Sequence, residues 1–269
     1  MRVVASLATM PGREVAALAA IASLAPQVSR VNVCLNGHRD KLPIYWENVE
    51  TFRNIVNVGD QAKFHWADTG YVRGADFHFV CDDDIIYPSD YVGEMIDHME
   101  EHGEDIAGLH GVILMPQALP QPRRRGRMPQ YLNGVLISEP SGGPSQAEPW
   151  LPLNSYYRQR RVFHCTQALT ERVPVHILGT SSCAYRPAKL EVHESFFKKP
   201  NMGDIWFGIL AQQQRVQMWC VPRPANWITL HKEIAPGTTI FEQMKAGGDG
   251  EPTGVVNMIR PWEIFESAS

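Results

Sequence analysis

The chain lacks the marks of a disulfide-rich, zinc-bound or membrane-spanning protein. Its 269 residues contain only five cysteines, an odd number, and no two of them form a Cys-x-x-Cys spacing. Most of these cysteines lie in apolar, strand-like runs, so we expect reduced residues in a core rather than a disulfide framework or a zinc site. No apolar run approaches the roughly 20 residues that a membrane span needs.

A strong excess of positive charge is also missing. The formal net charge is −4 at pH 7, which gives no support for nucleic-acid binding as the main activity. The N-terminus begins with a strand-like run, Arg2 to Leu7, in place of a cationic leader followed by an apolar segment. We therefore expect a cytoplasmic protein, either free or in peripheral contact with a membrane, and no nucleic-acid partner.

The first 114 residues alternate between strand-like and helix-like segments. This rhythm favours an α/β fold, with a mixed, mainly parallel sheet and helices on its faces. Ligands of such sheets bind at the carboxyl ends of the strands, so functional side chains are expected there. Strands are predicted at 2–8, 28–35, 54–58, 76–81 and 105–114, and helices at 14–25, 61–67 and 91–102.

The composition changes at residues 115–161, which are rich in proline, glycine and arginine. The segment is too long for an ordinary connection, so a long flexible loop is predicted. Its cationic run, residues 121–127, would meet an anionic acceptor, a diphosphate or a lipid surface, or would be merely solvated. Residues 162–269 form a second half with a C-terminal tail. Further strands are predicted at 161–166, 173–186 and 217–221, and a helix at 203–215.

The most informative stretch is an apolar strand that ends in three carboxylates. Asp82, Asp83 and Asp84 follow the run 77–81 and precede an Ile-Ile-Tyr-Pro turn. Three adjacent negative charges at the end of a buried strand repel one another unless a cation or hydrogen-bond donors offset them. Mg2+ and Mn2+ bind carboxylate oxygens and leave positions for phosphate oxygens. The triplet therefore indicates a metal-held diphosphate, with a solvated acidic turn as the alternative.

Alternate side chains of an extended chain point the same way, so we expect Asp82 and Asp84 to bind one ion while Asp83 faces elsewhere. His231 is a candidate to complete the metal shell or to contact the phosphates. Since the chain has ten histidines, a structural role is the alternative. Arg13 and Lys63 follow predicted strand ends, and they would neutralise phosphate or orient carboxylates unless they are ordinary surface residues.

A second functional unit is predicted where Gly203 and Asp204 open an apolar helix. The helix dipole stabilises a carboxylate at this end. Asp204 is a candidate general base if it faces the same pocket as the metal, and the alternative is a helix N-cap worth about 1 kcal/mol. Among the aromatic residues, Trp206 is the first candidate to stack on a sugar or base. Tyr156 and Tyr157 would line either an acceptor groove or a loop.

Four stretches in this order resemble a glycosyltransferase of the GT-A fold, closest in pattern to family-2-like bacterial enzymes. They are the triplet with its Tyr-Pro turn, Gly-Thr-Ser-Ser at 179–182, Gly-Asp-Ile-Trp at 203–206 and the later His231. The resemblance spans residues 2–232 and departs at Gly203, where many members carry glutamate. It implies one GT-A-like domain over 1–269, with a Rossmann-like, nucleotide-sugar-binding half at 1–114 and an acceptor-side half from 162 onward.

The resemblance also assigns roles to individual residues. Asp82 and Asp84 would match the metal-and-nucleotide signature, with Mn2+ or Mg2+ as the cofactor, and His231 would complete the metal site. Asp204 would match the general base of inverting members. The donor-binding group would comprise Thr9, Arg13, Asp60, Lys63, Asp82 and Asp83, the first four of them beside the nucleoside.

The activity implied is hexosyl transfer from a nucleoside-diphosphate sugar, a UDP-sugar first and a GDP-sugar second, to a glycan or glycolipid hydroxyl in surface polysaccharide or glycolipid synthesis. The sequence does not name the donor sugar, the acceptor, the linkage or the oligomeric state. Two alternatives stay open. A sugar-nucleotide nucleotidyltransferase would want a glycine-rich N-terminal loop, and residues 7–13 contain only Gly12. A non-catalytic metal- or carbohydrate-binding module would bind metal without nucleotide.

Overall fold

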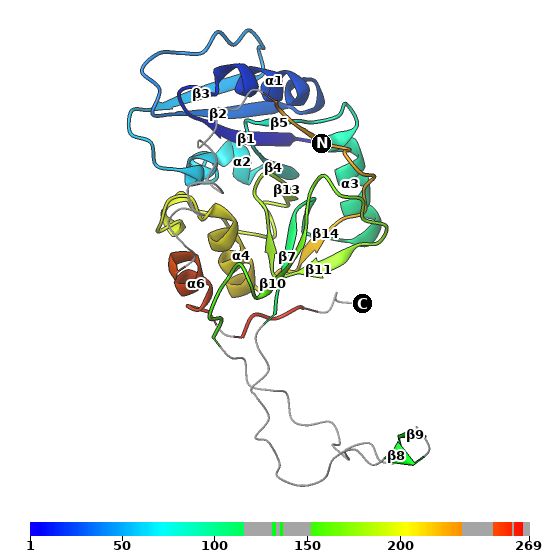
Figure 1. Ribbon diagram of the computed structural model, residues 1–269. Coiled ribbons are helices and arrows are strands. Elements are labelled where there is room, and N and C mark those ends of the chain that lie inside the picture. Colours follow the sequence, from blue (N-terminus) through cyan, green and yellow to red (C-terminus); the bar gives the residue numbers. More distant parts are fainter. Residues whose placement is uncertain (116–130, 133–134, 137–151, 233–249, 260, 266–269) are drawn as a thin grey trace.

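The computed structural model describes residues 1–115, 131–132, 135–136, 152–232, 250–259 and 261–265. Its centre is an eight-stranded sheet in the order β11-β14-β6-β13-β4-β1-β2-β3 (Figure 1). The mixed, mainly parallel sheet with flanking helices that the sequence predicts is thus confirmed. No helix among these residues is both long and apolar enough to cross a membrane.

Four parallel strands form one side of the sheet: β1 (Val3–Thr9), β2 (Arg30–Asn36), β3 (Val49–Asn54) and β4 (Phe77–Cys81). β1 pairs with both β2 and β4, and β2 pairs with β3. Because these strands run the same way, their carboxyl ends meet at one edge of the sheet. Helix α1 (Glu14–Leu24) carries the chain from β1 back toward β2.

An antiparallel strand joins this part to the rest of the sheet. β13 (Ser182–Tyr185) lies between β4 and β6 (Ile106–Gly108) and is antiparallel to both. Ser182 therefore pairs with Cys81, the last residue of β4, and the segment before β13 is brought to the same edge. The sheet is completed by β14 (Met218–Cys220), parallel to β6, and by the edge strand β11 (Val173–Val175).

Three smaller sheets accompany the main one. β7 (Gly111–Leu114) is the centre of an antiparallel sheet between β10 (Arg160–Phe163) and β12 (Ile177–Leu178). β5 (Ile85–Ile86) pairs with β15 (Thr229–Leu230), and β8 (Tyr131–Leu132) pairs with β9 (Val135–Leu136).

Two apolar cores lie on the two faces of the main sheet. Successive strand residues point to opposite faces, and Phe79 accordingly packs in one core while Val80 packs in the other. The first core includes apolar residues of α1 and of α3 (Tyr91–His102), and the second includes those of α4 (Gly203–Gln214) and α6 (Gly250–Val256) (Figure 1). The short helix α2 (Gly70–Arg73) packs on a third, smaller cluster.

Several predicted segments are wrong in detail. The strand predicted at 54–58 lies instead at 49–54, where an exposed edge strand has no apolar alternation to mark it. The single strand at 105–114 is broken into β6 and β7, which belong to different sheets, and 173–186 is divided into β11, β12 and β13. The helix predicted at 61–67 is a 3-10 turn, Asp60–Phe64.

The loop predicted at 115–161 is only partly described. Leu153 and Tyr156 are buried in the second core, and β10 begins at Arg160, so the last ten residues of this segment belong to the folded part and the flexible-loop prediction is wrong for them. The arginine-rich run at 121–127 lies outside the described residues.

Candidate active site

A cavity of about 820 Å3 opens at the carboxyl ends of the parallel strands, and its lining has two parts. Residues that follow the strand ends form what we call the acidic part. Residues around β7 and β10 form what we call the aromatic part. The acidic part comprises Arg13, Asp60, Lys63, Asp82, Asp83 and Asp84, the aromatic part comprises His110, Tyr156, Tyr157, Arg160, Val162 and His164, and Thr180 and Asp204 line the same cavity.

The acidic triplet is held in a turn by a buried tyrosine. The Asp82 N–H donates to the Tyr87 hydroxyl (2.8 Å), and that hydroxyl donates to the carbonyl of Ser181 (2.6 Å). Ser181 immediately precedes β13, so the bond ties the turn after β4 to the neighbouring strand. Tyr87, which follows the triplet in the sequence, therefore has a structural role: it holds the backbone of the acidic turn against the segment before β13.

Lys63 forms an ion pair with Asp82 inside the cavity wall. Its Nζ also donates to the carbonyl of Thr180 (3.2 Å). Burial alone disfavours the ammonium form of Lys63, but the carboxylates of Asp82 and Asp60 outweigh that effect and raise the pKa of the lysine. Lys63 is thus a buried, charged residue that orients a carboxylate, one of the two roles predicted for it.

Arg13 binds the other two carboxylates of the triplet. Its Nη1 lies 3.2 Å from Asp83 Oδ1, and its Nη2 contacts Asp84. Burial raises the pKa of Asp83 to about 7, although Arg13 opposes this shift. Although β4 ends at Cys81, the Asp83 side chain is buried while those of Asp82 and Asp84 are partly exposed. The expectation that Asp82 and Asp84 bind one ion while Asp83 faces elsewhere stays a prediction.

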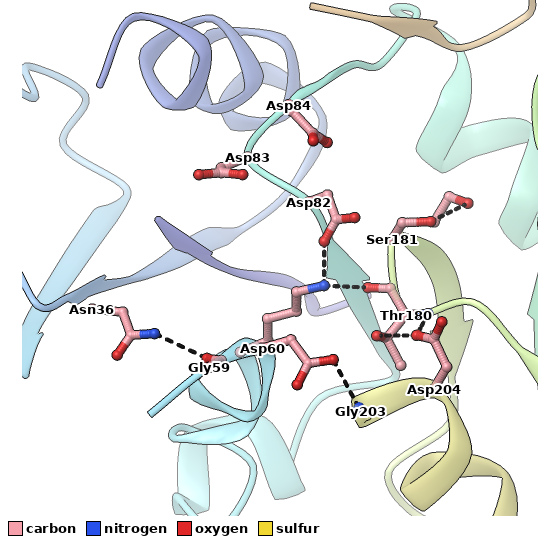
Figure 2. A network of polar contacts seen from close by, with 12 residues as sticks. Asn36, Gly59, Asp60, Asp82, Asp83, Asp84, Thr180, Ser181, Gly203 and Asp204 are labelled. Carbon is pink, nitrogen blue, oxygen red and sulfur yellow. Dashed lines mark hydrogen bonds and ion pairs between the residues drawn. The ribbon is translucent and has the colours of Figure 1, made fainter. Parts of the chain in front are cut away.

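The side chain of Asp60, which begins the 3-10 turn, contacts the N-terminus of helix α4. Its Oδ2 accepts a hydrogen bond from the Gly203 N–H (2.7 Å; Figure 2), and a Cβ added to Gly203 would lie 2.7 Å from that oxygen. The glycine at this position, where the resemblance expects glutamate, therefore leaves room for Asp60. Burial raises the pKa of Asp60 to about 6, Lys63 opposes the shift and Asp204 adds to it.

Asp204 is fixed by two hydrogen bonds on one oxygen. The backbone N–H and the hydroxyl of Thr180 both donate to Asp204 Oδ1, each at 2.7 Å (Figure 2). The N-cap alternative is wrong, because Asp204 lies inside the first turn of α4 and its carboxylate is held by Thr180. Thr180 thereby links the predicted base to Lys63, which binds the carbonyl of the same threonine.

The cavity lining also contains a residue that sequence reasoning missed. Asn36 ends β2, lines the cavity and donates through Nδ2 to the Gly59 carbonyl (2.9 Å) and to Asn57 Oδ1 (2.8 Å). Its place at a strand end, like that of Thr9, is the signal that could have identified it. Thr9 itself is buried at the end of β1 and is outside the cavity lining.

His231 lies next to the acidic turn, although 147 positions separate it from Asp84 in the chain. Its backbone N–H donates to the Asp84 carbonyl (2.7 Å), which extends the pairing of β15 with β5. The backbone of His231 therefore lies beside the triplet. Its role as a metal ligand stays a prediction.

The aromatic part of the lining is organised around Arg160. The guanidinium carbon lies 4.5 Å from the ring centre of Tyr156 and 4.6 Å from that of Tyr157. Both tyrosines line the cavity, as the groove interpretation of the sequence required. Trp206, the first candidate for stacking on a sugar, is wrong. It is buried edge-on against Phe196, with ring centres 5.8 Å apart, and it is outside the cavity lining.

The donor set of the acidic part suits a hard divalent cation. Asp60, Asp204 and the triplet contribute five carboxylates to the cavity lining, against three cationic side chains, so two negative charges are in excess when all are ionised. Burial is the main cause of the raised pKa values of Asp60 and Asp83, and neighbouring carboxylates add to it. A Mg2+ or Mn2+ ion would remove the excess, and carboxylate oxygens are the ligands that both ions prefer.

No protein-family model matches the chain, and no curated protein sequence matches it. Among solved structures it is similar to residues 1–349 of TarS from S. aureus, with 15% identity, a TM-score of 0.45, and coverage of 84% of this chain and 59% of that one. Another structure of S. aureus TarS shows 15% identity and a TM-score of 0.46, with coverage of 84% of this chain and 36% of that one. The 1–349 fragment in complex with UDP-GlcNAc shows 17% identity and a TM-score of 0.34, with coverage of 48% of this chain and 37% of that one.

The chain thus spans 59% of the length of the first of these structures. With identities of 15–17% and TM-scores below 0.5, the likenesses carry no argument about what this chain does.

Proposed function

We propose that the chain is a metal-dependent glycosyltransferase that moves a sugar from a nucleoside diphosphate to an acceptor hydroxyl with inversion. The supporting observation is that one cavity holds an acidic turn paired with two cations and, joined to it through Thr180, a carboxylate fixed by two hydrogen bonds. Its volume of about 820 Å3 lies within the range of small-molecule sites, about 300–1,000 Å3.

The acidic part would bind the donor. Asp82 and Asp84 would hold Mn2+ or Mg2+, with His231 at the edge of the turn, and the ion would neutralise the charge that grows on the departing diphosphate. Arg13 and Lys63 already contact these carboxylates, so their task is to orient the metal-binding groups. Base recognition would fall to the region around Asn36 and Asn57, for a UDP-sugar first and a GDP-sugar second.

Asp204 would act as the general base. Among the described residues both of its hydrogen bonds end on Oδ1, which leaves Oδ2 to accept a proton. As the acceptor oxygen bonds to the anomeric carbon, the bond from that carbon to the diphosphate breaks and the acceptor proton moves to Oδ2. Attack from the face opposite the leaving group inverts the anomeric centre.

The aromatic part would bind a glycan or glycolipid acceptor. Sugars stack on aromatic faces, and Tyr156, Tyr157 and Arg160 form a contiguous aromatic and cationic surface in the same cavity as Asp204. A hexose as the transferred sugar and a place in surface-polymer or glycolipid synthesis belong to this proposal. So do a cytoplasmic setting and peripheral contact with a membrane.

Nucleotide binding with and without metal tests the proposal. We expect UDP to raise the melting temperature of the metal-free protein only when Mn2+ or Mg2+ is present, with GDP as the second nucleotide to try. Screening of donor hydrolysis across UDP-, GDP-, CMP- and dTDP-sugars then names the donor. The absence of a response to any nucleotide would contradict the proposal. Stabilisation by metal alone would support a binding module, and release of pyrophosphate from a nucleoside triphosphate would support a nucleotidyltransferase.

A further inference from the structure

We propose that His110, His164 and Cys165 form a second metal site, selective for Zn2+ and similar borderline transition-metal ions, beside the cavity and separate from the acidic turn. One ligand atom from each of the three residues lies within 4.8 Å of those of the other two. Two imidazole nitrogens and a sulfur form a donor set that favours Zn2+ over Mg2+. The inference does not depend on the proposed transferase activity.

The strand pairing brings the three residues together. His110 lies in the turn between β6 and β7, and His164 directly follows β10. Because β7 and β10 are antiparallel and Phe163 pairs with Gly111, the residue before β7 and the residue after β10 are neighbours. Their ring centres are 5.3 Å apart. Cys165 is next in the chain, and its Sγ lies 3.9 Å from His164 Nδ1.

The separations are close to those of a tetrahedral zinc site. With Zn–N near 2.05 Å and Zn–S near 2.3 Å, ligand atoms of one ion lie about 3.3–3.6 Å apart. The three ligand atoms lie within 4.8 Å of one another, so they would approach by at most about 1.5 Å to reach this geometry.

Metal binding would change the protonation state of the cysteine. Zn2+ binds the thiolate form of cysteine and the unprotonated ring nitrogen of histidine. The ion would therefore replace the thiol proton of Cys165, which passes to solvent as the metal–sulfur bond forms.

A second layer of contacts holds His164 in place. Its Nδ1 lies 2.9 Å from the Thr166 hydroxyl, a contact that orients the ring. Arg223 is buried and donates through Nη2 to the His164 carbonyl (2.8 Å). Both histidines line the cavity. The fourth position of a tetrahedral ion would thus open toward the cavity, where water or an oxygen atom of a bound molecule can occupy it.

Cobalt titration of the full-length, reduced, metal-free protein tests the site. Co2+ bound by a thiolate gives an intense charge-transfer absorption that carboxylate ligands do not give. We expect one equivalent to produce this band, Zn2+ to abolish it, and excess Mg2+ to leave it unchanged, since Mg2+ prefers oxygen ligands to nitrogen and sulfur.

Substitutions identify which residues bind the Co2+ ion that gives this absorption band. Cys165→Ser is expected to remove it, and His110→Gln to weaken Co2+ binding by at least about tenfold. Cys34→Ala is the matched control, because Cys34 is another buried, unpaired cysteine outside the cavity lining, and it is expected to keep the band. Circular dichroism shows whether each variant is folded.

Three results would overturn the inference: no thiolate band in the folded wild type, a band that persists in Cys165→Ser, or a band that Cys34→Ala removes equally. The first needs no variant, so a folding failure cannot hide it. Nucleotide binding with Mn2+ is measured separately, which distinguishes failure here from failure of the proposed transferase.

Discussion

The acidic and the aromatic parts of the cavity are built in different ways. In the acidic part the three triplet carboxylates pair with Lys63 or Arg13, and the residues follow the ends of parallel strands. In the aromatic part, rings and a guanidinium stack on one another around two antiparallel strands. Fixed, paired charges suit a partner of constant chemistry such as a diphosphate. A stacked surface tolerates partners of several shapes.

Asp204→Asn should give the largest effect, because Asp204 stands where the two parts meet. Removal of the proton acceptor is expected to lower the turnover number about 100- to 10,000-fold, with nucleotide binding unchanged. Steady-state kinetics and nucleotide titration separate the two quantities. Asp97→Asn, on the exposed face of α3, is the control. If the two variants have the same turnover number, Asp204 is not the general base.

Lys63→Met tests whether paired charges hold the acidic part together. The substitution leaves Asp82 and Asp60 without their cation, and we expect a loss of about 3 kcal/mol in the free energy of unfolding, at the lower end for a broken buried ion pair. Urea denaturation measures it. Lys199→Met breaks an exposed pair with Glu251 and should cost less than about 1 kcal/mol. If the two losses are equal, the buried pair has no special role.

Asp83 should make stability depend on pH. Its pKa is raised from 3.8 to about 7 in the folded protein, so between these values the folded state keeps a proton that the unfolded state has lost. The metal-free protein should therefore become less stable as pH rises from about 4 to about 7. Melting temperatures across this window should fall less steeply for Asp83→Asn than for the wild type. Identical slopes would show that Asp83 is ionised throughout.

Arg160→Ala should give the smallest effect, confined to the aromatic part. Loss of its stacking on Tyr156 and Tyr157 is expected to raise the KM for the acceptor about three- to tenfold, since cation–π contacts are worth about 0.5–2 kcal/mol. The KM for the donor and the turnover number should not change. Arg158→Ala, at an exposed neighbouring position, controls for charge. A matching rise in the donor KM would show that the two parts are not independent.

Sequence reasoning selected residues whose place in the cavity follows from local position. The triplet comes directly after β4, Arg13 lies four residues after the end of β1, and Asp204 is in the first turn of a helix. The sequence also showed that Gly203 stands where many glycosyltransferases of the resembled family carry glutamate. It did not show why, because the side chain that occupies the space beside Gly203 belongs to Asp60, which lies 143 positions away in the chain.

The features that sequence reasoning missed depend on strand pairing and tertiary packing, which no local sequence pattern reveals. His110 and His164 meet because β7 and β10 are antiparallel, and the sequence shows neither the break that starts β7 nor its partner. β3 was misplaced because its residues are mostly exposed and carry no apolar alternation. Trp206 was assigned to the site because it follows Asp204, but successive helix residues point in different directions, and this one packs into the core.

The two-residue pairing of β5 with β15 has a consequence for the order in which the molecule is assembled. All eight strands of the main sheet are complete by Cys220, but the partner of β5 begins only at Thr229. During synthesis from the N-terminus the scaffold can therefore form before the acidic turn acquires its last support. A nascent chain that stops between these two points would have the sheet without a finished site.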